Sequence, residues 1–201
     1  MTLFEYDNEI RKNYSVFCGV DEAGRGPLAG DVYAAAVILK PDADIEFLND
    51  SKKLSEKKRN YLYDIVIQNA VSYCVATATV EEIEKYNILQ ATFLAMRRAV
   101  EGLSINVDIA LVDGNRDPGL NFKTETIIKG DGTSASIAAA SILAKVSRDR
   151  YMEKIALEYP QYQFEKHKGY GTKLHYETIS EYGPSPIHRM SFLKKFYEHD
   201  Q

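Results

Sequence analysis

The stretch that decides the fold runs from Val16 to Leu39 and reads VFCGVDEAGRGPLAGDVYAAAVIL. Two runs of mostly apolar residues, Val16–Val20 and Asp31–Leu39, flank a glycine-rich connection, and this pattern predicts two strands that form a hairpin. Beyond it, the expected strands are Val71–Thr79 and Val107–Val112, and the expected helices are Ser55–Ala70, Val80–Gly102 and Thr133 or Ser134 to Tyr159. An early hairpin followed by alternating helices and strands predicts an α/β fold, a mixed β-sheet flanked by helices.

The length and composition indicate one domain. The chain has 201 residues, of which 45% are hydrophobic, so it can bury an ordinary core. We expect a single domain over residues 1–201, in which residues from about 160 to 201 form a helical C-terminal extension packed on the sheet.

Several classes of protein are disfavoured by composition. No apolar run is long enough to cross a bilayer and Met1–Tyr14 is charged, so we expect a cytoplasmic protein without a membrane partner. Two cysteines, Cys18 and Cys74, lie in apolar runs and are expected to be buried thiols. With 25 basic and 29 acidic residues there is no global attraction to nucleic acid, and any binding must come from a local patch.

Acidic residues stand at the ends of predicted elements. Asp21 and Glu22 end the first strand, Asp113 follows Val107–Val112, and Asp131 precedes the cap of the last long helix. Alone, an Asp-Glu pair is more often an exposed turn, and Asp131 more often part of a turn. Because ligands gather beyond the carboxyl ends of strands in α/β sheets, the four together favour one acidic cluster that holds Mg²⁺ or Mn²⁺.

Other polar residues give weaker signals. A set of basic residues near the second predicted helix could contact phosphates, although a solvated helix face explains them equally well: Lys52, Lys53, Lys57, Lys58 and Arg59. On the long helix, Lys145, Arg148 and Arg150 are expected to be exposed, about half of them facing DNA. The histidines at 167, 175, 188 and 199 have no zinc-like spacing and are expected to be surface or local packing groups.

Five motifs together resemble bacterial ribonuclease HII. They are GVDEAGRGPLAG, DSKKLS at Asp50–Ser55, LVDGN at Leu111–Asn115, SIAAASILAKVSRDR at Ser136–Arg150 and GYGT at Gly169–Thr172. The resemblance covers about Val16 to Phe192 in the family's order. It implies a ribonuclease H-like fold and cleavage of RNA paired with DNA, including cleavage 5′ of single ribonucleotides embedded in duplex DNA. It also implies two divalent ions and products with a 3′-OH and a 5′-phosphate.

Residue roles follow from the same motifs. The resemblance implies that Asp21, Glu22, Asp113 and Asp131 are the catalytic metal-binding carboxylates, and our hypothesis is that Asp21 bridges both ions. Gly24, Arg25 and Gly26 would sense the ribose 2′-OH, whose recognition needs a backbone free of Cβ atoms. Tyr170 would stack at the junction with deoxyribose, although it is also one of 14 tyrosines and a local aromatic cluster explains it about as well without the resemblance.

The expected partners are nucleic acids. The resemblance implies RNA/DNA hybrids and ribonucleotide-containing duplex DNA as substrates, and nothing in the sequence indicates an obligate protein partner or oligomer, so we expect a monomer. The aromatic pair Phe196-Tyr197 is compatible with docking on a replication clamp but lacks a convincing flanking motif.

Three other functions are less consistent with the sequence. Ribonuclease HIII carries an additional N-terminal substrate-binding domain and lacks the Gly-Arg-Gly pattern. A ribonuclease H-like nuclease of the transposase or Holliday-junction type would be indifferent to ribose in the substrate. A non-catalytic nucleic-acid-binding module would not need four clustered acids, which repel phosphate unless a metal is present.

Overall fold

The fold is built on one mixed β-sheet. The structure, a computed structural model, describes residues 1–48 and 54–198. The strands are β1 (Phe17–Ala23), β2 (Val32–Leu39), β3 (Ala70–Ala78), β4 (Ile109–Asp113) and β5 (Thr124–Ile127), in the spatial order β3-β2-β1-β4-β5. The neighbours β1, β2 and β3 pair antiparallel, whereas β4 pairs parallel with both β1 and β5. The predicted hairpin and mixed sheet are confirmed.

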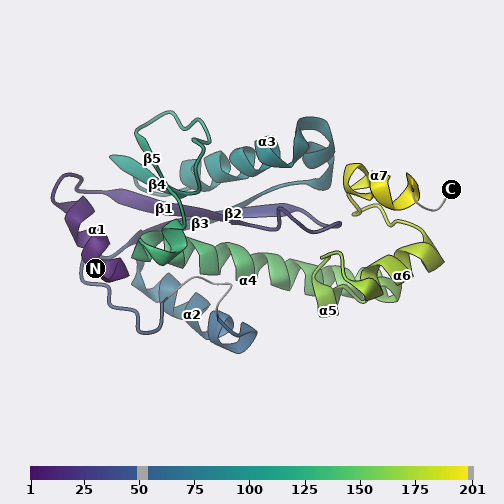
Figure 1. The fold of residues 1–201 in the computed structure, drawn as a ribbon. Helices are drawn as coiled ribbons and strands as arrows, with labels where there is room; N and C mark the ends of the chain where they lie inside the picture. The colour runs from purple at the N-terminus through teal and green to yellow at the C-terminus, as the bar shows by residue number, and fades with distance from the viewer. Residues whose placement is uncertain (49–53, 199–201) are drawn as a thin grey trace.

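Helices cover both faces of the sheet (Figure 1). Helix α3 (Val80–Glu101) packs on one face, and α4 (Ala135–Glu158) packs on the other, with α2 (Glu56–Asn69) and α1 (Leu3–Arg11) against α4. Successive residues of β2 belong to opposite layers, because Ala35 and Val37 lie in the core beneath α4 while Ala34 and Ala36 lie in the core beneath α3. Burial on both faces explains why this strand is continuously apolar.

The start of α4 lies very close to β1. A Cβ built on Gly19 would stand 2.1 Å from the main-chain carbon of Ser136, so only glycine allows this approach. The predicted cap Ser134 accepts a hydrogen bond from the Ile137 N–H, 3.3 Å away. From α1, the buried carboxylate of Asp7 accepts hydrogen bonds from both the N–H and the hydroxyl of Ser136, 2.9 and 2.7 Å away. These contacts fix α4 on the sheet.

Helix α1, the four-residue strand β5 and the short helix η2 (Gly130–Gly132) were not predicted from the sequence. The predicted helix Val80–Gly102 is present as α3, but Asn87 interrupts it with a φ of 69°. Both cysteines are free thiols, Cys18 buried as expected and Cys74 only partly buried.

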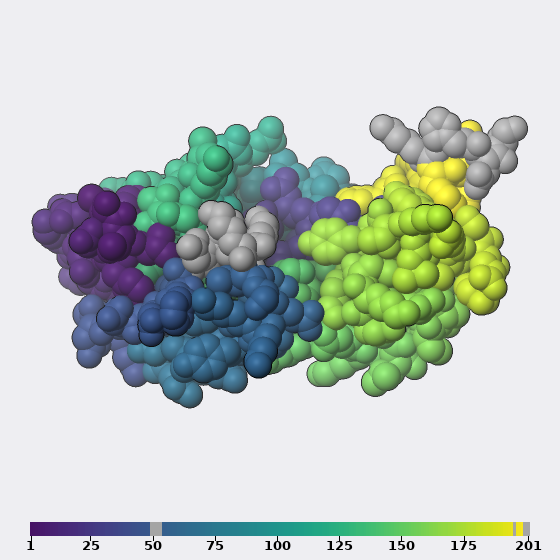
Figure 2. Space-filling view, turned by 60° about the horizontal axis from the view of Figure 1, so that its bottom comes forward, coloured from purple at the N-terminus to yellow at the C-terminus, as the bar shows by residue number. Residues whose placement is uncertain are grey.

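The chain after α4 is helical in short pieces, as predicted. It comprises η3 (Pro160–Tyr162), α5 (Phe164–His167), α6 (Lys173–Tyr182) and α7 (Met190–Glu198). These pieces gather at one end of the molecule, beyond α4 (Figures 1 and 2). Main-chain hydrogen bonds join them to the β1–β2 connection, because Leu28 donates to the Gly169 carbonyl and Gly30 to the Ile187 carbonyl. That residues 1–201 form a single domain stays a prediction.

No helix in the described ranges combines the length and the apolar character that a membrane crossing needs.

Candidate active site

Asp21 and Asp113 lie near the carboxyl ends of two central strands. β1 and β4 run parallel in register, with Val20 opposite Val112, so Asp21 and Asp113 follow at the same edge. Only 2% of Asp21 is exposed. Desolvation by burial, followed by the charges of Glu22 and Asp113, raises the pKa of Asp21 well above its usual value. The negative charges of Glu22 and Asp113 therefore disfavour the ionised form of Asp21.

One oxygen of Asp21 is left without a hydrogen bond. Its Oδ1 accepts from the Glu22 N–H, 2.7 Å away. Its Oδ2 is buried and accepts no hydrogen bond of good geometry among the described residues, while the nearby Ser141 side chain acts to lower the pKa of the carboxyl. A buried carboxylate oxygen that nothing satisfies is costly, and a hard cation would satisfy it.

The other acids bind separate donors. Asp113 Oδ1 accepts from the Gly130 N–H at 2.6 Å, and Glu22 Oε1 lies 3.3 Å from Nη1 of Arg25. Asp131 is buried in the short helix η2 (Gly130–Gly132), next to the residue that binds Asp113. Within the ranges that the structure describes, no three metal-ligating side chains converge into a ready-made site.

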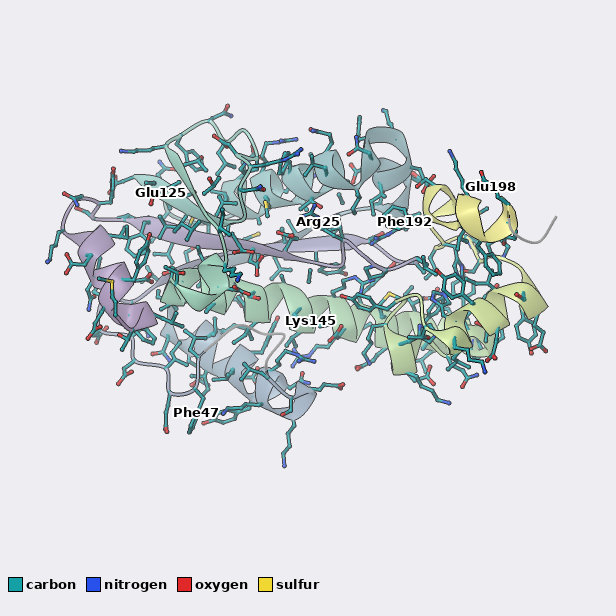
Figure 3. All side chains as sticks on the ribbon, viewed as in Figure 1. Arg25, Phe47, Glu125, Lys145, Phe192 and Glu198 are labelled. Carbon is teal, nitrogen blue, oxygen red and sulfur yellow. The ribbon has the colours of Figure 1, made fainter. Side chains whose placement is uncertain are left out.

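The predicted sugar-sensing residues line one pocket. Gly24, Arg25, Gly26, Lys145 and Tyr170 surround a volume of ≈ 330 Å³ that also contacts Glu22. Figure 3 shows that Arg25 comes from the segment after β1 and Lys145 from α4. The ring of Tyr170 is 40% exposed, and a Cβ built on Gly26 would lie 3.9 Å from its Cε1. The structure thus brings together residues that are far apart in the sequence.

A second pocket adjoins the acids on the α3 side. It also measures ≈ 330 Å³, shares Glu22 and Arg25 with the first pocket, and is lined further by Phe93, Asn115 and Arg116. Sequence reasoning did not single out Phe93 or Arg116, because Phe93 fits the apolar spacing of α3 and Arg116 lies in an unpatterned loop. Glu22 therefore lies between two pockets, and arginine side chains line both of them.

The family model of Ribonuclease HII matches residues 18–195 of the chain. The chain belongs to the ribonuclease HII family. Ribonuclease HII of Caldicellulosiruptor bescii is 55% identical over 95% of this chain and 93% of its own length. That of Dechloromonas aromatica is 58% identical over 87% and 89%. The crystal structure of ribonuclease H2 from Pyrococcus horikoshii OT3 superposes with a TM-score of 0.74 at 28% identity, covering 92% of this chain and 98% of that chain.

Family membership makes the chain a ribonuclease H, a hydrolase of RNA paired with DNA. The resemblance read from the five motifs is confirmed, and the family match favours ribonuclease HII over ribonuclease HIII.

One prediction about the basic residues of this ribonuclease H is wrong. Arg148 was expected to be exposed, but it is completely buried, whereas Arg150 is exposed and Lys145 is partly buried. The Arg148 side chain turns inward because main-chain carbonyls surround it, and the 2.9 Å bond from its Nη1 to the Lys168 carbonyl is an example. Lys145 pairs with Asp149 at 2.7 Å while lining the first pocket.

The remaining basic candidates lie near α2. Lys57 and Lys58 belong to its first turn, where Lys57 is exposed and Lys58 partly buried, with the Lys58 ammonium 3.7 Å from the centre of the Phe47 ring. Arg59 is partly buried and donates to the Leu54 carbonyl. Lys52 and Lys53, with the rest of the segment 49–53, lie outside the described residues.

Three of the four histidines are packing groups. His167, His175 and His188 are buried and stack near Phe164, with 4.3 Å between the ring centres of His167 and His175. Each ring binds main-chain groups, which agrees with the packing role predicted. His199 lies outside the described residues.

Proposed function

We propose that this ribonuclease H cuts on the 5′ side of single ribonucleotides embedded in duplex DNA, as well as within the RNA strand of longer hybrids. The products would carry a 3′-OH and a 5′-phosphate. The observation that carries the proposal is the pocket in which Gly24, Gly26 and Tyr170 meet beside Glu22. A surface that binds one sugar next to the acids suits a substrate with one ribose among deoxyriboses.

We propose further that Asp21, Glu22, Asp113 and Asp131 hold two Mg²⁺ or Mn²⁺ ions when substrate is bound. The unpartnered buried Oδ2 of Asp21 fits such a group, and a donor set of carboxylate oxygens suits hard cations. The ions would supply an activated water and neutralise the charge of the phosphate.

The chain's own residues would select and orient the substrate. The backbone of Gly24–Gly26 would bind the ribose 2′-OH, and the exposed ring of Tyr170 would stack on the neighbouring deoxyribose. Arg25 and Lys145 at the rim would attract the phosphates, which a protein of net charge −4 cannot do through its overall field.

We propose that the enzyme acts as a cytoplasmic monomer without an obligate protein partner. The aromatic pair considered for clamp docking is already engaged in the structure. The ring of Phe196 packs on Tyr176 with 5.3 Å between centres, and Tyr197 lies edge-on against Phe196. This packing disfavours the pair as a free docking motif.

The test uses an end-labelled DNA duplex with one ribonucleotide, incubated with the protein and Mg²⁺. We expect one cut 5′ of the ribonucleotide, no cut in the all-DNA duplex, and no cut by the Asp21→Asn variant. Cleavage of the all-DNA duplex would favour a nuclease that ignores ribose. No cleavage with either Mg²⁺ or Mn²⁺ would contradict the proposal.

A further inference from the structure

A buried arginine in the C-terminal segment binds the connection between β1 and β2. Arg189, just before α7, is 0% exposed. Its Nε and Nη2 donate to the Gly30 carbonyl at 2.9 and 2.7 Å, and Nη2 also donates to the Gly24 carbonyl at 2.7 Å. Its Nη1 donates to the carbonyls of Arg25 and Pro27, at 3.1 and 2.8 Å. One guanidinium thus donates hydrogen bonds to four main-chain carbonyls of a single loop.

A second buried arginine completes this set from α4. Arg148, also 0% exposed, donates from Nε to the Asp31 carbonyl at 3.2 Å and from Nη2 to the Ala29 carbonyl at 3.0 Å. Its side chain fills the space beside Gly24, where a Cβ would stand 2.1 Å from Nε. Gly24 has a φ of +96°, which favours glycine in any case. The two arginines therefore fix most of the loop from Gly24 to Asp31.

The same arginine reaches the segment that carries Tyr170. Its Nη1 donates to the Lys168 carbonyl at 2.9 Å, and its Cζ lies 5.8 Å from the centre of the Tyr170 ring. Leu28 donates to the Gly169 carbonyl, which ties the two segments a second time. The loop and the tyrosine are therefore held as one body.

Two buried positive charges are costly, and fold stability alone does not explain them. Among the described residues, neither guanidinium forms an ion pair with a carboxylate. Burial lowers the pKa of both groups, that of Arg189 to about 9, which leaves Arg189 charged at neutral pH. A guanidinium is not deprotonated in proteins, so Arg148 is charged as well. Burying a charge costs free energy even when main-chain carbonyls accept its hydrogen bonds, so the two arginines call for a role beyond stability of the fold.

The geometry of the peptide bond shows what that role is. In a trans peptide the carbonyl and the N–H point in opposite directions. Because Arg189 binds the carbonyls of Gly24 and Arg25, the N–H groups of Arg25 and Gly26 point away from the buried guanidinium. These are the donors that a ribose hydroxyl beside Gly24–Gly26 would meet.

We infer that Arg189 and Arg148 are positioning residues that orient the peptides of Gly24–Gly26 and lock them to the Tyr170 segment, and so set the preference for ribose over deoxyribose. The inference rests on the proposed function, since it concerns the sugar-binding part of that same site. It also gives the C-terminal segment a role in specificity, because Arg189 belongs to it.

The test measures binding in the Asp21→Asn background, where the substrate is expected to stay intact. Fluorescence anisotropy gives the affinity for a duplex with one ribonucleotide and for the matched all-DNA duplex. We expect Arg189→Lys to reduce the ratio of the two affinities about tenfold while leaving the all-DNA affinity unchanged, since a lysine ammonium cannot reproduce the planar set of donors. In the otherwise wild-type enzyme, we expect Arg189→Lys to lower kcat more than tenfold and to leave the shift in Tm caused by Mn²⁺ unchanged.

The control is Arg98→Lys. Arg98 also donates to a main-chain carbonyl, that of Thr77 at 2.9 Å, but it lies on α3 and lines neither pocket. We expect it to change neither the ratio nor kcat. A folded Arg189→Lys variant with a lower Tm but an unchanged ratio would overturn the inference.

If Arg189→Lys does not fold, Arg148→Lys gives the deciding ratio by the same measurement. Failure of the wild-type enzyme to cut the ribonucleotide-containing duplex is a separate outcome, and it would contradict the proposed function itself.

Discussion

At the residue scale, Asp21 combines a cost in stability with the catalytic role that we propose for it. Its carboxylate is buried, carries one unsatisfied oxygen and lies near two other acids. Each feature destabilises the metal-free protein, and each suits a cation-binding group. Function and stability therefore oppose each other at this residue.

Replacing the charge of Asp21 separates the two effects. We expect Asp21→Asn to abolish cleavage and to raise the Tm of the metal-free protein by about 2–4 °C, because it removes the desolvation cost of a buried charge and the repulsion from Glu22 and Asp113. Differential scanning calorimetry in the presence of a chelator measures the shift. A lower Tm than that of the wild type would show that the carboxylate stabilises the fold instead.

Tyr170 is expected to act through its ring. Tyr170→Phe keeps the stacking surface and should retain most of the cleavage activity, whereas Tyr170→Ala should lower kcat/KM about tenfold or more. Tyr61→Ala is a matched control, because this tyrosine is also exposed, at 63%, and lies on α2 outside both pockets. Equal cleavage rates for Tyr170→Ala and the control would rule out a stacking role.

The roles of some of these residues could be predicted from the sequence, and those of others could not. The positions of Asp21 and Asp113 after apolar strands placed them at one sheet edge, as the parallel register confirms. Arg148 and Arg189 carried no such signal, since their partners are main-chain carbonyls, which every sequence contains. An arginine that binds such partners looks like any surface charge until the fold is known.

At the scale of elements, two neutral histidines support the segment of Tyr170. His175 donates from Nδ1 to the Tyr170 carbonyl at 2.9 Å, so its Nε2 accepts. Nδ1 of His188 accepts from the Ser185 N–H, so its Nε2 donates to Nε2 of His175, 3.0 Å away. Protonating either ring would break this chain of hydrogen bonds.

The pH dependence of stability follows from these rings. Burial is the main cause that lowers the pKa of His175 and of His188 to about 4, below the usual 6.5. As the pH falls below 6.5 the unfolded chain takes up protons first, so this stability is complete above pH 6.5 and is lost toward pH 4. Between pH 7.5 and 5 we expect a loss of about 1–2 kcal/mol per histidine in the free energy of unfolding, measured with urea.

The matched variant for this measurement is His188→Gln. It should lose less stability than the wild type over the same interval, and the comparison cancels the opposite contribution of Asp21, whose raised pKa favours the folded state as the pH falls. Equal losses for the two proteins would contradict the role given to His188.

The two elements β5 and α1 were not predicted because their sequences have little hydrophobic periodicity. Strand β5 has only four residues, all at least partly exposed, and so lacks an apolar run. Helix α1 buries only Asp7, an acid, whose role depends on serines of α4 more than 120 positions away. Long, strongly apolar elements such as β2 and α4 were predictable because their pattern reports their own burial.

At the scale of the whole molecule, the candidate site joins distant parts of the chain. The sheet carries the acids, while the segments after α4 carry Tyr170 and Arg189. The α/β class could be predicted from the order of strands and helices. No sequence pattern indicated that the C-terminal segment binds the β1–β2 connection through Arg189 and Gly169. We therefore propose a division of labour, in which acids on the sheet would support hydrolysis and a loop held from outside the sheet would select ribose.

The most direct test of this division compares Gly26→Ala with Asp21→Asn. Gly26 is the cleaner probe of the loop, because a Cβ there meets nothing closer than 3.9 Å, whereas at Gly24 it would collide with Arg148. Mn²⁺ affinity by calorimetry, Tm, and cleavage of the single-ribonucleotide duplex are measured for both variants. We expect Gly26→Ala to keep its Tm and Mn²⁺ affinity but to cleave about tenfold more slowly or worse, and Asp21→Asn to lose both Mn²⁺ binding and cleavage. Full cleavage by Gly26→Ala, or loss of its Mn²⁺ binding, would contradict this proposal.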